Sequence, residues 1–155
     1  MIEHRLDVSA SYQTLVAIWA SILISQVLLF GLIYLTSPEL FELDPSKPML
    51  GENPMFVLLI AVESALSLVI SIIKSGDYVK QAVDEQKTEH VQTALIIGVA
   101  LTTSVSLWGV FLAVAFDYQY FFIWMTVGFV ATCLHFPRRS DLENASRNSV
   151  ADAKA

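Results

Sequence analysis

The chain has 155 residues and a formal net charge of −6, with 55% hydrophobic and 15% charged residues and a mean hydropathy of +0.59. Soluble domains carry about 25% charged residues, so this composition excludes both a soluble and a disordered protein and indicates a membrane protein. The negative charge argues against a nucleic-acid partner, and the single cysteine, Cys133, excludes a disulfide framework and a zinc cluster built on cysteines.

Four apolar stretches have about the length that a helix needs to cross some 30 Å of hydrocarbon, which is roughly 20 residues. We therefore expect an all-α fold, a four-helix transmembrane bundle within residues 12–136. An N-terminal arm, 1–11, precedes it and a polar tail, 137–155, follows it. The predicted spans cover residues 12–35, 54–73, 92–116 and 119–136.

The ends of the spans have signals of their own. Asn53 followed by Pro54 is typical of a helix start, since proline fits the first helical position. Aromatic side chains crowd residues 116–124, as expected at a membrane interface. The very short connection there predicts that the third and fourth spans form an antiparallel hairpin. The polar segment 77–90 contains no proline and is expected to extend the third span as a helix, whereas 141–155 is expected to be loosely ordered.

The distribution of lysine and arginine predicts the orientation. Of the nine such residues, only Lys47 lies in the connection between the first two spans; the other eight lie on the opposite side. The positive-inside rule then places both termini in the cytoplasm. The first span is too long for a signal peptide and lacks a cleavage site, so we expect it to be retained. Without an organelle-targeting segment, the expected location is the cytoplasmic (inner) membrane of a bacterium.

Two spans have stripes of small residues at helical spacing. Small side chains let helix backbones approach closely, and such packing drives helix association within lipid. We therefore expect these stripes to be packing faces. They consist of Thr14, Ala17, Ser21 and Ser25 in the first span and of Gly98, Thr102, Ser106 and Gly109 in the third.

Glu63 is the charged residue near the middle of the second span, and no lysine or arginine lies at the same depth. An ionised carboxyl at that depth costs several kcal/mol, so it is expected to be neutral, paired or exposed to water. Polar residues at similar depth predict a polar layer around it: Ser25, Gln26, Ser67, Thr102 and Thr103.

Three interpretations of Glu63 remain open at this point. It is a proton- or cation-binding site, with a carboxyl pKa raised by burial and with hydroxyl and amide oxygens around it. Alternatively, it is a protonated group that joins helices by a hydrogen bond to Gln26 or to a hydroxyl of the third span. In the third interpretation, it faces a cation on a partner subunit.

The third span also resembles a known family. Its sequence TALIIGVALTTSVSLWGVFLAVAF, Thr93 to Phe116, is similar to the carboxylate-bearing helix of ATP synthase c subunits, the proteolipids of the rotor ring. The shared pattern is an apolar run, then small and polar residues, then an aromatic residue and glycine, here Trp108 and Gly109. With the second span, residues 54–116 resemble that family's helical hairpin, which implies a similar style of helix packing. The position that matches the family's ion-binding carboxyl is Thr103, which cannot exchange a proton, so rotor function does not follow.

No sequence motif for catalysis, metal binding or cofactor binding is present, so we expect a non-enzyme without metal or cofactor. The expected partners are the lipid bilayer and other membrane subunits or further copies of the chain. The expected function is that of a subunit or accessory component of a larger membrane complex, for example an energy-converting one. The alternative is a small oligomeric transporter or channel, coupled to protons or cations through Glu63.

Overall fold

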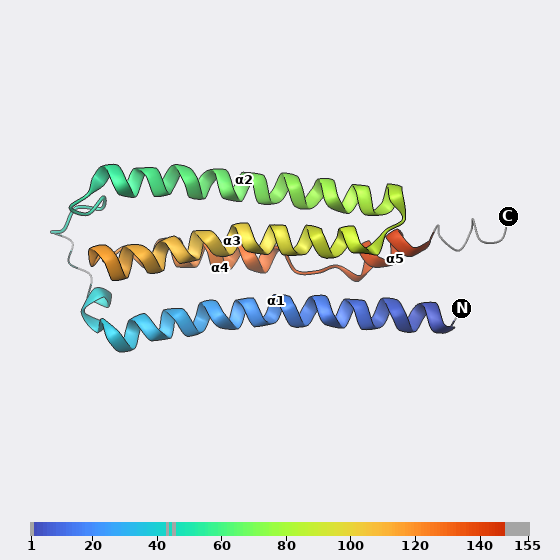
Figure 1. Cartoon of the computed structure of the whole chain (residues 1–155). Helices are drawn as coiled ribbons and strands as arrows, with labels where there is room; N and C mark the ends of the chain where they lie inside the picture. Colours follow the sequence, from blue (N-terminus) through green and yellow to red (C-terminus); the bar gives the residue numbers. More distant parts are fainter. Residues whose placement is uncertain (1, 43, 45, 148–155) are drawn as a thin grey trace.

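The computed structural model of the protein describes residues 2–42, 44 and 46–147; these residues form helices joined by turns and loops, with no strand among them. The expected all-α fold is thereby confirmed. Long helices lie side by side, with the beginning of the chain and α5 at one end of the bundle and η1 at the other (Figure 1). The elements are α1 (Ile2–Thr36), η1 (Pro38–Phe41), α2 (Pro54–Glu85), α3 (Thr88–Phe116), α4 (Phe121–Leu134) and α5 (Arg139–Arg147).

Three helices in the described part of the chain, α1, α2 and α3, are long and apolar enough to cross a membrane. The predicted fourth span is shorter than expected, because α4 has 14 residues and so extends only about 21 Å at 1.5 Å per residue. It becomes a fourth candidate span only together with α5, from which it is bent by 41°. Pro137 lies in the break between them, where proline cannot continue a helix.

The interior consists of two apolar clusters, one toward each end of the bundle. At the η1 end, Ile33 of α1, Val57 of α2 and Leu112 of α3 pack with Phe121 of α4. At the other end, the cluster contains residues from four helices: Leu15, Ala82, Val91, Leu95, Val99, Leu142 and Ala145. The polar side chains of the middle of the bundle lie between these two clusters.

Two predicted boundaries agree with the structure. Helix α2 begins at Pro54, although the Asn53 side chain forms no capping hydrogen bond. Helix α3 ends at Phe116, and Asp117 has a left-handed backbone conformation with φ of 47°. The chain reverses within residues 117–120 and α4 packs against α3. The predicted hairpin is therefore present.

Helix α1 begins at Ile2, so the described part of the predicted N-terminal arm continues the first helix. Two expectations about the polar segments were wrong. Most of the segment 77–90 extends α2 rather than α3, since α2 continues to Glu85, the turn comes at Gln86, whose backbone is left-handed, and α3 begins only at Thr88. The tail is not loosely ordered over its first part: α5 buries Leu142 and Ala145 completely. Residues 148–155 lie outside the described residues.

Candidate functional site

A cluster of polar side chains joins α1, α3 and α4 in the middle of the bundle. Its centre is Gln26, which is only 3% exposed. The Gln26 amide nitrogen donates hydrogen bonds to the hydroxyl oxygens of Thr103 and Thr132, both at 3.1 Å. Its amide oxygen accepts one from the Ser106 hydroxyl at 3.3 Å, and the hydroxyls of Thr102 and Thr132 lie 3.0 Å apart. Every polar atom of the Gln26 amide group therefore has a partner on another helix.

Small residues make this cluster possible because they let α3 and α4 approach closely. A Cβ atom added at Gly128 would overlap Ser106 and the Thr102 carbonyl oxygen. One added at Gly109 would come within 2.9 Å of the Phe121 carbonyl oxygen. The predicted packing role of Gly98, Ser106 and Gly109 agrees with their burial, and Gly98 faces the ring of His135.

The Trp19 indole and the His135 imidazole make further polar contacts between helices near this cluster. The Trp19 indole N–H donates to the Thr132 carbonyl oxygen at 2.9 Å. His135 Nδ1 lies 2.9 Å from the Ala131 carbonyl oxygen, which can only accept, so Nδ1 carries the hydrogen. His135 therefore presents Nε2 toward the Ser71 hydroxyl of α2 at 3.5 Å, a long contact.

Glu63 is on α2 and is not part of the Gln26 cluster. Its Oε1 accepts a hydrogen bond from the Ser67 hydroxyl, one turn further along the same helix, at 2.7 Å. Its Oε2 is buried and has no hydrogen-bond partner among the described residues, and the same is true of the neighbouring Ser64 hydroxyl. Ser64 and Ser67 are 2% and 6% exposed, so both hydroxyls face the interior of the bundle.

This arrangement distinguishes between the interpretations of Glu63. A hydrogen bond from Glu63 to Gln26 or to a hydroxyl of α3 does not occur in the described part of the chain, and the Gln26 amide is fully used elsewhere. The ion pairs found there involve Glu85 and Glu143, far along the chain from Glu63. The hydrogen bond to Gln26 or to a hydroxyl of α3 is therefore not formed among the described residues, and the interpretations of Glu63 as a proton or cation site and as a partner contact stay open.

The predicted polar layer is thus two separate groups rather than one. Gln26, Thr102 and Thr103 come together, but their additional partner is Thr132 and not Glu63. Of the predicted layer, Ser67 is the residue whose hydroxyl donates to the Glu63 carboxyl among the described residues. Ser25 is exposed, and its hydroxyl donates to the Ile22 carbonyl oxygen of its own helix.

The predicted packing face of the first span was also wrong as an internal contact. Ala17 and Ser21 are exposed on the outside of α1, as is Thr14. The hydroxyls of Thr14 and Ser21 donate to carbonyl oxygens four residues earlier, at 3.0 and 2.8 Å, so neither needs a partner. The face of α1 that packs inward contains Leu15, Trp19 and Gln26 instead.

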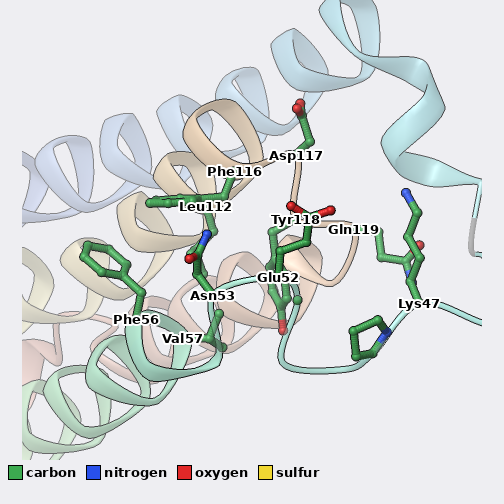
Figure 2. Close-up of a pocket in the computed structure, with 12 residues that line it drawn as sticks. Lys47, Glu52, Asn53, Phe56, Val57, Leu112, Phe116, Asp117, Tyr118 and Gln119 are labelled. Atoms are coloured by element: carbon green, nitrogen blue, oxygen red, sulfur yellow. The ribbon is translucent and has the colours of Figure 1, made fainter.

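A cavity of about 220 Å³ lies at the η1 end, between the segment before α2 and the turn before α4. Figure 2 shows Glu52, Tyr118 and Gln119 among its lining residues. The Tyr118 hydroxyl donates to the Met49 carbonyl oxygen at 2.6 Å, and burial raises the pKa of that hydroxyl. The Gln119 amide nitrogen donates to the Asp44 carbonyl oxygen at 2.9 Å. These polar groups hold the long connection against the turn, so we assign them a structural role.

The chemistry available in the described residues rests on the Glu63 carboxyl and the hydroxyls beside it. No group of three or more His, Cys, Asp or Glu side chains there is placed to hold a metal ion. Cys133 is a free, partly buried thiol. Comparison with models of known families, with curated proteins and with solved structures finds no match to this chain.

Proposed function

We propose that the protein is a non-enzymatic, multi-pass membrane protein that serves as a subunit or accessory component of a larger membrane assembly. The proposed location is the cytoplasmic membrane of a bacterium, with both termini on the cytoplasmic side. There are four crossings in this arrangement, α4 and the segment after it being the fourth. The orientation is supported by the position of α5 near the beginning of α1 and by the lysine and arginine distribution.

The observation that carries this proposal is the outward position of the small-residue stripe on α1. The corresponding stripe on α3 is covered by α4 and the segment after it. On α1, Ala17, Ser21 and Ser25 remain uncovered, and only 11% of the most apolar stretch of α1 is buried, compared with 44% for α3. A smooth face of small residues is what a second helix needs for close approach within lipid.

The experiment is gentle extraction at natural expression level, followed by measurement of the native mass and identification of the co-purifying proteins. The protein is expected to travel with stoichiometric partners. The double variant Ala17→Leu/Ser21→Leu is expected to lose them, because the added side chains separate the backbones. Ala65→Leu, at an exposed small residue of α2, is the matched control and is expected to keep them. A wild-type protein that runs alone contradicts the proposal.

The second candidate function is a small transporter or channel coupled to protons or cations, and the unpartnered Oε2 of Glu63 favours it. Proton or cation flux is measured in liposomes that contain the purified protein. In this function, Glu63→Gln abolishes the flux, because the amide cannot release a proton or balance a cation. The exposed Glu52→Gln is the matched control. A homo-oligomer with flux that survives Glu63→Gln excludes a role for this carboxyl.

A further inference from the structure

A second cavity, of about 460 Å³, lies at the end of the bundle formed by the beginning of α1 and by α5. It is larger than the cavity of about 220 Å³ at the η1 end. Its wall is built by α1, α2, α3 and the segment that joins α4 to α5. Leu15, Val91 and Leu95 are the buried apolar residues of this wall. A long apolar group therefore has a surface to lie against.

The polar part of this cavity carries two cations from different elements. Lys80 comes from α2 and Arg138 from the segment before α5, and the Asp141 carboxylate is the one acidic side chain among the lining residues. In the part of the chain that the structure describes, the lysine and arginine side chains in ion pairs are Lys87 and Arg139, so neither Lys80 nor Arg138 forms one. The lining thus has a net positive charge with two uncommitted donors.

The cavity lies where the apolar segment of α2 gives way to polar residues. That segment ends at Ile73, and the polar Ser75 and Lys80 are among the lining residues beyond it. In the proposed membrane arrangement, this boundary corresponds to the headgroup region. A Cβ atom added at Gly76, which is also a lining residue, would meet nothing within 4 Å. There is thus open space beside α2 at Gly76.

We propose that this cavity binds an anionic phospholipid, with the lipid phosphate between Lys80 and Arg138 and an acyl chain along the apolar wall. Arginine and lysine donate charge-assisted hydrogen bonds to phosphate oxygens, and arginine can do so with two parallel bonds. The apolar wall beside these cations favours a lipid over a free phosphate ion, because only a lipid has an acyl chain that can pack against it. The inference depends on the membrane location and not on the proposed role as a subunit.

The test is native mass spectrometry of the purified protein with phosphatidylglycerol, with phosphatidylcholine of the same acyl chains, or with inorganic phosphate. We expect one tightly retained phosphatidylglycerol per chain and much weaker retention of phosphatidylcholine. A cation near an anionic lipid contributes about 1 kcal/mol, so Lys80→Gln or Arg138→Gln should weaken retention about fivefold and the double variant about 30-fold. Inorganic phosphate that displaces the lipid at millimolar concentration would overturn the lipid assignment.

The matched control is Lys74→Gln/Arg139→Gln. It removes the same charge from α2 and from the beginning of α5, but neither residue lines the cavity. Equal loss of lipid in both double variants would mean diffuse surface attraction and would refute the site.

Discussion

Replacement of Gln26 by leucine tests whether the polar cluster holds α1 against the hairpin of α3 and α4. The variant removes three interhelical hydrogen bonds, to Thr103, Thr132 and Ser106, while keeping a similar side-chain volume. Hydrogen bonds between membrane helices contribute about 0.6 kcal/mol each on average, so their sum is about 2 kcal/mol. The loss is reduced because the hydroxyls of Thr132 and Ser106 keep backbone acceptors, at 2.8 and 3.3 Å. We expect a destabilisation of about 1–2 kcal/mol.

The assay is equilibrium unfolding in mixed micelles with an increasing fraction of sodium dodecyl sulfate, followed by circular dichroism. Gln13→Leu is the matched control, because Gln13 is on the same helix but exposed. It is expected to change the free energy of unfolding by no more than about 0.5 kcal/mol. The reasoning is refuted if Gln26→Leu unfolds at the same detergent fraction as the wild type or at a higher one. It is equally refuted if the control loses as much stability.

Three further outcomes follow from individual side chains. Gly128→Ala should lower the free energy of unfolding by about 1–3 kcal/mol, because the added methyl overlaps the backbone nitrogen of Ser106. Gly31→Ala is the control: its methyl meets only open space, so in the same unfolding assay it should be neutral or stabilising. Glu63→Leu should leave that free energy unchanged or raise it by up to about 2 kcal/mol, because it removes a buried, unpartnered oxygen; a clear loss would show that the carboxyl is held by structural contacts. Glu85 accepts hydrogen bonds from Gln81, His90 and Lys87, which lower its pKa from 4.5 to about 2. Its stabilising effect is therefore complete above pH 4.5 and is lost as the pH falls toward 2. If the stability of Glu85→Gln falls as much as that of the wild type over this pH range, the ion-pair argument is contradicted.

The sequence predicts the existence of the helices well but the direction of their faces poorly. Hydropathy alone locates α1, α2 and α3, because a membrane crossing demands a long apolar run. Ala17 and Ser21 illustrate the failure. Lipid does not penalise small residues on an outer face, and the Ser21 hydroxyl is satisfied by its own helix. A stripe of small residues therefore has no signal that distinguishes an internal contact from an external one.

The burial of Gln26 was easier to predict, because its side-chain amide needs hydrogen-bond partners that lipid cannot provide. An amide has both a donor and an acceptor end, which are costly to leave unpaired within lipid, so burial against other helices was predictable. Thr132 was not predicted as part of the polar layer, since a hydroxyl that bonds to its own backbone gives no sign of a second role. The burial of α5 was missed because Leu142 and Ala145 are two apolar residues in an otherwise polar segment.

Gln26 and Glu63 differ in how completely their polar atoms are hydrogen-bonded, and this difference points to Glu63 on α2 as the candidate functional group. Both are polar groups within spanning helices, yet Gln26 finds a partner for each of its polar atoms and Glu63 leaves one oxygen buried and unpaired. A bundle held together by its polar contacts should weaken when Gln26 is replaced and should not weaken when Glu63 is. Opposite signs for the two leucine variants would mean that Glu63 costs the fold stability. Such a result would support the proposed proton or cation site at Glu63, because a carboxyl that only joined the helices would be expected to stabilise them.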